Sequence, residues 1–185
     1  MSYHHIGLVS LTLSINEAEI AVPKLIAYLQ DRKIIEPILS DCINRDGQGY
    51  APGPNYLDAI EHPEYGAHIL QNKVNGLDIT TGKCMSTNAT GDYSKVACPK
   101  CKAERPQDDA WSDAASLWIE GQDVSDLLCE SCQMGSPIFL WDHFGDIAFG
   151  HLMLEFCSWP MVKKEFVKSL SEVAGSDFVV IQGHL

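Results

Sequence analysis

Two cysteine pairs of identical spacing, CPKC at residues 98–101 and CESC at residues 129–132, constrain this chain more than any other feature. A Cys-x-x-Cys turn can present two thiolates to one metal ion, and two such turns supply the four ligands of a tetrahedral site. The 27 residues between the pairs are enough for a hairpin, or a hairpin with an elaboration, that brings the pairs together. The sequence therefore predicts one structural Zn²⁺ ion, bound by Cys98, Cys101, Cys129 and Cys132.

Other uses of the four thiols fit the pattern less well. An iron–sulfur cluster also takes four cysteines, but the paired spacing favours a single tetrahedral ion. A thioredoxin-like redox pair is disfavoured because CPKC does not lie between a predicted strand and a predicted helix, and because it has a matching second pair. Two disulfides would need an oxidising compartment, whereas an odd total of seven cysteines favours a reducing one.

The segment from residue 98 to residue 132, about a fifth of the chain, resembles a zinc ribbon. The resemblance implies a structural metal ion and says little about function. The connection between the two pairs is longer than in a compact ribbon. Inside it we expect Leu117–Gly121 (LWIEG) to form a ribbon strand. Trp111 and Trp118 are expected either to cover the metal site with apolar surface or to pack in an ordinary core.

Outside this segment, the periodicity of apolar residues predicts alternating strands and helices. We expect strands at 5–14, 77–81, 146–156 and 177–181, helices from about 22 to 35 and from 161 to 175, and a long loop at 36–68 with a short helix near 56–60. With the cysteine segment in the middle, this is the split βαβ order of a ferredoxin-like α+β sandwich. We therefore expect one α+β domain over residues 1–185, with a zinc-ribbon insert at 95–135 in the central connection.

The ends of the two helices are predicted from capping signals. Gly175 should end the second helix because glycine adopts the left-handed conformation common after a last helical turn. For the first helix, Asn16 and Glu19 could form an early capping box, but Pro23 would then lie inside the helix. A start at Val22, with Pro23 in the first turn, avoids this problem and is the interpretation we prefer.

The charge of the chain limits its partners. The 25 acidic and 13 basic residues give a net charge of -12, which repels phosphate backbones and anionic lipids and attracts cationic proteins. Residues 102–128 alone contain seven acidic and two basic residues. We therefore expect a basic protein partner rather than nucleic acid or a membrane. The N-terminus lacks the pattern of a signal peptide, no apolar run approaches a membrane span, and the predicted location is the cytoplasm.

The best candidates for catalysis are Asp142, His143 and Asp146 in the segment WDHFGD, with His151 nearby. A carboxylate beside an imidazole can orient it as a base, and carboxylates with histidines can bind a metal ion. However, no nucleophile motif, zinc-protease motif or phosphate-binding loop accompanies them. A polar turn before a buried strand, with His151 hydrogen-bonded, explains the segment as well. Cys84 or Cys157 paired with His143 is a further catalytic hypothesis, since triads are spatial, and His62 and His68 are interpreted as loop histidines.

Together these observations favour a non-catalytic cytoplasmic protein that contains zinc and acts by binding another protein. In overall character, small and acidic, the chain resembles immunity or inhibitor proteins, which implies neutralisation of a cationic toxin or nuclease. Two alternatives stay open. One is a hydrolase or transferase that uses Asp142, His143 and Asp146, and the other is a transcription-associated zinc-ribbon protein.

Overall fold

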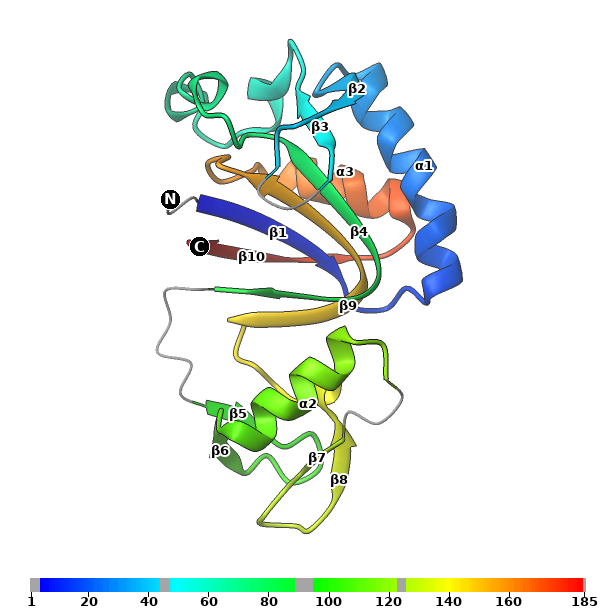
Figure 1. Ribbon diagram of the computed structural model, residues 1–185, viewed down its shortest axis with the longest axis vertical. Helices are drawn as coiled ribbons and strands as arrows, with labels where there is room; N and C mark the ends of the chain where they lie inside the picture. Colours follow the sequence, from blue (N-terminus) through cyan, green and yellow to red (C-terminus); the bar gives the residue numbers. More distant parts are fainter. Residues whose placement is uncertain (1–3, 44–46, 89–94, 123–125, 185) are drawn as a thin grey trace.

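The computed structural model describes residues 4–43, 47–88, 95–122 and 126–184. Its strands are β1 (His4–Ser10), β2 (Ile35–Ser40), β3 (Gly49–Pro52), β4 (Leu77–Thr87), β5 (Lys95–Ala97), β6 (Glu104–Pro106), β7 (Asp126–Leu128), β8 (Gly135–Pro137), β9 (Ile147–Cys157) and β10 (Phe178–His184). Its α-helices are α1 (Ile15–Asp31), α2 (Asp109–Ile119) and α3 (Lys164–Ala174), and short 3₁₀ turns lie at Tyr56–Ala59, Pro63–Tyr65, Ile69–Gln71 and Ile138–Leu140. Figure 1 shows the large sheet above and the cysteine segment below it.

The main sheet has six antiparallel strands in the order β10-β1-β9-β4-β3-β2. Four of these strands, β10, β1, β9 and β4, come from two interleaved split βαβ units. The unit β1-α1-β4 leaves room for β9 between its strands, and the unit β9-α3-β10 leaves room for β1. The predicted α+β class is confirmed, and the strand order is the one that the ferredoxin-like interpretation requires.

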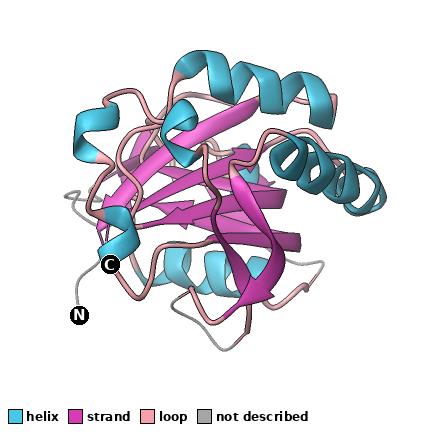
Figure 2. Ribbon diagram, turned by 90° about the horizontal axis from the view of Figure 1, so that it is seen from above, coloured by secondary structure: helices cyan, strands magenta, loops and turns pink. Residues whose placement is uncertain are grey.

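Helices α1 and α3 pack together on one face of the sheet, and the main hydrophobic core lies beneath them. Alternate residues of the central strands, Ile6 and Leu8 in β1 and Leu152, Leu154 and Phe156 in β9, point into this core. Helix α3 contributes Phe166 and Leu170 and ends, as predicted, at Gly175, which has a φ of 74°. Figure 2 shows helices on both sides of the strands, because α2 lies on the other side from α1 and α3.

The predicted start of the first helix was wrong. Helix α1 begins at Ile15, and Ser14 caps it: the Ser14 hydroxyl accepts a hydrogen bond from the Glu17 backbone, and the Glu17 carboxylate accepts one from the Ser14 backbone. This capping box satisfies two backbone N–H groups that the helix cannot use. Pro23 lies inside the helix on its exposed side, where water can solvate the backbone carbonyl that loses its helical partner.

The region predicted as a long loop contains a hairpin. Strands β2 and β3 pair with each other, and Tyr50 in β3 pairs with Leu77 at the start of β4, so the hairpin extends the sheet beyond the four predicted strands. Glycine and proline at both ends of β3 hid its pattern in the sequence. The predicted short helix near residues 56–60 is present as the 3₁₀ turn Tyr56–Ala59.

Strands β4 and β9 are each 11 residues long and bend over the sheet (Figure 1). The register between them shifts between Thr81 and Cys84, and Gly82 in the shifted segment has a φ of 92°. Beyond the bend, the two strands cross the face of β1 and β10 that is opposite the helices. A small core of Val9, Cys84, Ala148, Met153 and Ile181 lies between the layers. The bend therefore carries the ends of β4 and β9 to the cysteine segment.

We call the part built from β5, β6, α2, β7, β8 and the 3₁₀ turn Ile138–Leu140 the cysteine module. Ala97 at the end of β5 forms two backbone hydrogen bonds with Asp142, which closes the module at its base. Helix α2 packs against β4 and against the 3₁₀ turn Ile138–Leu140. Along the described helices, no stretch is both long and apolar enough to cross a membrane.

Candidate metal centre

The first cysteine pair lies in a turn that joins the hairpin strands β5 and β6. The backbone N–H of Cys98 donates to the carbonyl of Ala103, and the N–H of Lys102 donates to the carbonyl of Cys98. Lys102 has a left-handed backbone with a φ of 62°, which turns the chain back toward β6. The N–H of Lys100 points at the Cys98 Sγ at 3.4 Å. The turn thus places a backbone N–H donor beside the Cys98 sulfur.

The second pair repeats the same backbone geometry in the hairpin of β7 and β8. The N–H of Cys129 donates to the carbonyl of Met134, and the N–H of Gln133 donates to the carbonyl of Cys129. Gln133 has a φ of 58°, at the position equivalent to Lys102 in the first turn. The two turns are thus the same structural unit used twice, which is the arrangement that the zinc-ribbon resemblance implied.

The two turns bring the four cysteine sulfurs together. All four Sγ atoms lie within 4.8 Å of one another, with 3.9 Å between Cys98 and Cys132 and 3.6 Å between Cys101 and Cys129. A tetrahedral ion with bonds of about 2.3 Å to sulfur, as Zn²⁺ has, requires sulfurs about 3.8 Å apart. No disulfide joins them. The residues therefore fit a four-coordinate metal ion, as predicted, while the geometry alone does not name the metal.

The ionisation of the thiols shows why a cation suits this site. Backbone N–H groups of Cys132 and Ser131 favour the Cys129 thiolate and lower its pKa to about 7, against the effect of burial. At Cys132, the Met134 N–H also favours the thiolate, but burial and the sulfurs of Cys129, Cys101 and Cys98 outweigh it and raise the pKa to about 12. The second charge is thus opposed by the crowding of sulfur atoms, and a bound dication would remove that opposition.

An apolar core supports the two turns. Cys98 and Cys129 are buried in it together with side chains from α2, the two hairpins, the 3₁₀ turn after β8 and the start of β9: Val96, Ala114, Ala115, Trp118, Leu127, Ile138, Trp141, Ile147 and Phe149. Because the module's strands are only three residues long, their backbone pairing is too short to be stable alone. The packing of this core, rather than strand pairing, must therefore hold much of the module in shape.

The predicted ribbon strand at Leu117–Gly121 was wrong. Its first residues belong to helix α2, which begins after Asp108. The Asp108 carboxylate accepts a hydrogen bond from the Trp111 backbone and two from the Arg105 guanidinium, at 2.8 and 2.6 Å, and this Arg105 contact lowers the Asp108 pKa. Arg105 also donates to the carbonyl of Leu128 in β7, so it links the helix start to both hairpins.

The two tryptophans have core-packing roles. Trp118 is buried, packs against Phe149 and His151, and donates its Nε1–H to the carbonyl of Cys84 at 3.3 Å. This residue therefore joins the module to the bent ends of β4 and β9. Trp111 is half-buried and donates its Nε1–H to the Nε2 of His143 at 3.3 Å.

The segment with the candidate catalytic residues forms a tight turn before β9. His143 is buried against Phe149, whereas Asp142 is exposed and uses its Oδ1 to accept the Phe144 N–H at 2.9 Å. Asp146 is half-buried, and its N–H donates to the carbonyl of His143. The Asp142 carboxylate thus stabilises the turn, and the His143 Nε2 accepts a hydrogen bond from Trp111 within the module's core.

The state of His143 can be tested by pH. Burial lowers its pKa to about 4, so the folded protein holds this ring neutral. Since an unfolded histidine titrates near 6.5, stability from the neutral ring is full above about pH 6.5 and is lost as the pH falls toward 4. We expect the unfolding free energy of the wild type to fall by about 1–2 kcal/mol more than that of His143→Gln between pH 7 and pH 5. Urea unfolding at both pH values measures this, and Gln keeps an acceptor for Trp111. An equal fall in both proteins would contradict the assignment.

Other candidate residues lie apart. His151 is half-buried and its Nδ1 contacts the carbonyl of Leu13 at 3.0 Å, in agreement with a hydrogen-bonded histidine. The Cys84 thiol donates to the carbonyl of Gly150 in the small core between the layers. Cys157 packs in another cluster, with Cys42 and Ile43. His143 belongs to neither of these clusters, and His62 and His68 are exposed, as expected for loop histidines.

Sequence reasoning did not predict how the module is fixed to the sheet. Trp118 and the backbone pair of Ala97 and Asp142 have this role. The signal for this in the sequence was the spacing of Ala114, Ala115 and Trp118, which matches one face of a helix.

Within the described ranges, the four cysteines are the single group of three or more side chains that could hold a metal ion. Compared with protein-family models, curated proteins and solved structures, the chain gave no match.

Proposed function

We propose that this chain is a non-catalytic protein-binding protein whose cysteine module folds around one structural Zn²⁺ ion. The observation that carries the proposal is the cluster of four thiols in two equivalent turns. Four thiolates complete a tetrahedral shell, so the ion has no open position for a substrate or an activated water. Its role is then to supply folding energy. The thiols need a reducing compartment, and a cytoplasmic location is part of the proposal.

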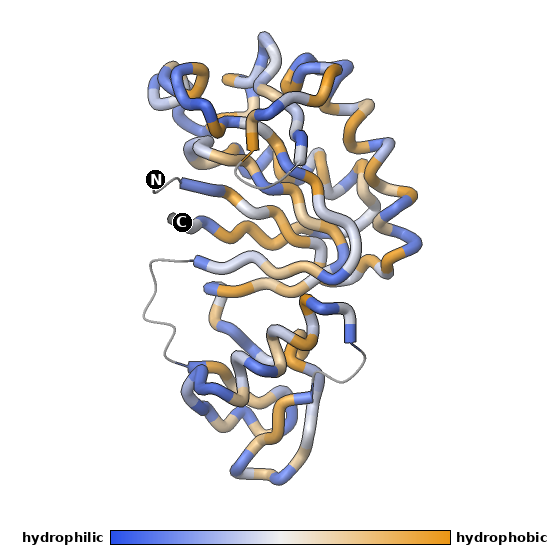
Figure 3. The backbone as a smooth tube through the Cα atoms, in the orientation of Figure 1, coloured by the Kyte–Doolittle hydropathy of each residue, from blue (hydrophilic) through white to orange (hydrophobic). Residues whose placement is uncertain are grey.

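The surface of the module supports binding to another protein. Five of its large apolar side chains are between about two fifths and just over half exposed: Ile119, Leu128, Met134, Phe139 and Leu140. Leu128 and Met134 flank the second cysteine turn, and Phe139 lies against Trp118 at a ring distance of 4.8 Å. In Figure 3 hydrophobic and hydrophilic residues alternate along the module. A contiguous apolar patch rimmed by polar groups is typical of surfaces that bind proteins, and the proposal is that these five side chains form one.

The charge of the module indicates the kind of partner. The module carries exposed acidic residues: Asp109 and Asp113 on α2, Glu120 just after it, and Asp126 and Glu130 near the second cysteine turn. A cationic protein would be attracted over a distance, and nucleic acid would be repelled. The overall resemblance to immunity or inhibitor proteins suggests a basic toxin or nuclease as this partner. Enzymatic use of Asp142 and His143 is less well supported, because the His143 ring is buried and already hydrogen-bonded.

Two measurements test this proposal. Elemental analysis of protein purified without added metal should give one zinc per chain.

For the partner, the zinc-loaded chain should capture a cationic protein. Once purified, that protein should bind the chain with an affinity that falls as the salt concentration rises. Leu140→Lys should weaken this binding at least tenfold. Ile20→Lys, on the exposed side of α1, is the matched control and should leave it unchanged. Binding that survives Leu140→Lys, or a folded chain purified without metal, would contradict the proposal.

A further inference from the structure

The two edges of the main sheet differ in how they are protected. Strand β2, at one edge, contains Glu36 and Pro37 and has an irregular register with β3, all of which oppose pairing with another chain. Strand β10, at the other edge, reads FVVIQGH and contains no proline or lysine. It pairs with β1 and, among the described strands, with no other. Its second side thus offers backbone groups for pairing.

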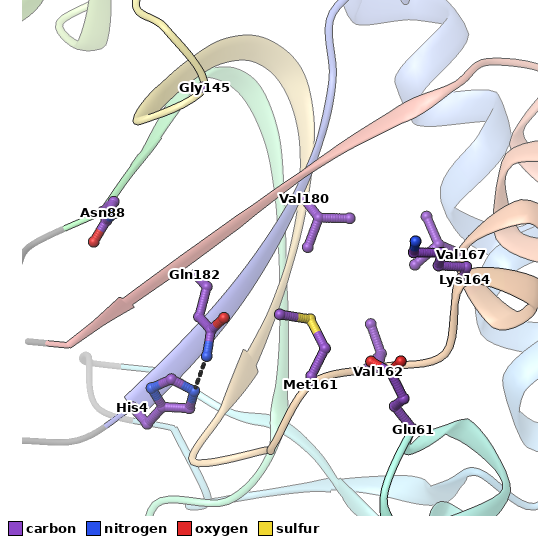
Figure 4. A pocket seen from close by; sticks show the side chains of 10 residues that line it. All are labelled: His4, Glu61, Asn88, Gly145, Met161, Val162, Lys164, Val167, Val180 and Gln182. Atoms are coloured by element: carbon purple, nitrogen blue, oxygen red, sulfur yellow. Dashed lines mark hydrogen bonds between the residues drawn. The ribbon is translucent and has the colours of Figure 1, made fainter.

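A cavity of about 670 Å³ lies along this open side of β10 (Figure 4). Val180 and Gln182, on alternate positions of the strand, line its floor. On the helix side, the wall comes from Met161 and Val162 and from the first turn of α3, with Lys164 and Val167. We call this cavity the β10 groove. Its volume is within the range of about 300–1,000 Å³ that ligand sites have.

The opposite wall of the β10 groove comes from the other layer of the fold. Asn88 follows β4 and Gly145 precedes β9, and the N–H of Asn88 donates to the carbonyl of Asp146, which joins the two segments. Because β4 and β9 bend across the face opposite the helices, these residues reach the edge of β10 from the second side. The edge of β10 therefore lies between two walls, in the place where a seventh strand would continue the sheet.

The side chains in the β10 groove define what it can bind. Met161, Val167 and Val180 give an apolar surface, and Gln182 is held by a 2.9 Å contact with the His4 ring. Lys164 and Glu61 supply one charge of each sign, and neither makes an ion pair within the part of the chain that the structure describes. A complementary ligand has an apolar side chain flanked by one acidic and one basic group, with backbone groups for β10.

We propose that the β10 groove binds an extended segment of another protein, which adds to β10 as a further strand. Main-chain hydrogen bonds would supply affinity, and the apolar surface would accept alternate side chains of the segment. A second copy of this protein is a poor occupant. Its own β10 edge lies between the same two walls, so the two edges could not reach each other to pair. The proposal concerns a surface outside the cysteine module and does not depend on the bound metal.

The probe is a random heptapeptide library displayed on phage, selected against the full zinc-loaded chain. We expect enriched sequences with apolar residues at alternate positions and without central proline. A selected peptide, labelled for fluorescence polarisation, should lose at least tenfold in affinity when Val180→Lys or Lys164→Glu is introduced. Both residues are exposed, so neither change should prevent folding. Lys168→Glu has the same charge change on the same helix, outside the groove, and should bind as the wild type does.

Methylation of the peptide's backbone nitrogens gives a readout specific to strand addition. Only every second N–H of an added strand faces β10. N-methylation at one alternate set of positions should therefore abolish binding, while methylation at the other set should not. No enrichment above an unrelated protein would overturn the proposal, as would binding that ignores Val180→Lys or is equally sensitive at every nitrogen. Concentration-dependent dimers that Val180→Lys abolishes would also overturn it, because the occupant would then be a second copy.

Discussion

Replacing Cys101 by serine is expected to abolish metal binding and to unfold the cysteine module, while the six-stranded sheet stays folded. Cys101 is exposed, so the substitution leaves no cavity, unlike a change at the buried Cys98 or Cys129. The module's own strands are short and its apolar core is small, so under the proposed function the metal would supply much of its stability. Binding of a structural zinc ion is worth about 10–16 kcal/mol in small zinc domains.

Hydrogen exchange read by mass spectrometry measures the expected result. Amides of β5 to β8 and α2 should exchange at least a hundredfold faster in Cys101→Ser, whereas β1 and the central part of β9 should keep their protection. Chelation of the wild-type protein should have the same effect. Lys100→Ala, a change inside the same turn that removes no ligand, is the control and should keep both metal and protection. Equal exchange of the module with and without metal would contradict this prediction.

The cysteine site was the part of the molecule that sequence could predict best. Its signal is local: each turn needs only a cysteine pair of fixed spacing, and one ion can then join the turns. The prediction failed for Leu117–Gly121, where a short apolar run is compatible with either a strand or a helix. Asp108 decided between them, because its carboxylate caps α2 while Arg105 holds it in place. The missed signal was thus a helix cap nine residues before the run.

The order of strands and helices could also be predicted, since it depends on periodicity within single segments. The start of α1 could not, because the choice depended on whether a proline would be tolerated inside a helix. Pro23 is tolerated since it lies on the exposed side, and exposure is a property of the folded chain. The hairpin of β2 and β3 was missed for a similar reason: its pairing with β4 through Tyr50 and Leu77 joins distant residues.

The bend of β4 and β9 left almost no signal in the sequence, yet it determines where the module and the β10 groove lie. It depends on contacts between strands that are far apart in the chain. Gly150 in β9 is such a contact, because it lies directly against the backbone of Ser10 in β1. A glycine within an apolar strand can mark a close approach of another backbone, but the partner strand cannot be read from the sequence.

Gly150→Ala is therefore expected to destabilise the whole sheet. A Cβ at this position would overlap the Ser10 carbonyl oxygen and would lie 2.7 Å from the Cγ1 of Val9. Backbone atoms cannot rotate away as a side chain can, so β9 must shift away from the end of β1 at the bend. We expect the unfolding free energy to fall by about 3 kcal/mol, and the melting temperature by roughly 6–12 °C for a chain of this size. Chemical unfolding and calorimetry measure these changes.

Gly135→Ala is the matched control for this prediction. It is the same chemical change in strand β8, where a Cβ would meet its nearest neighbour, the Asp126 carboxylate, at an ordinary 3.5 Å. It should change the unfolding free energy by less than about 0.5 kcal/mol. The bend also places Asn88 and Gly145 beside β10, so Gly150→Ala should weaken peptide binding in the β10 groove even where the protein is still folded. A Gly150→Ala protein as stable as the control would show that β9 does not approach the end of β1 as closely as described.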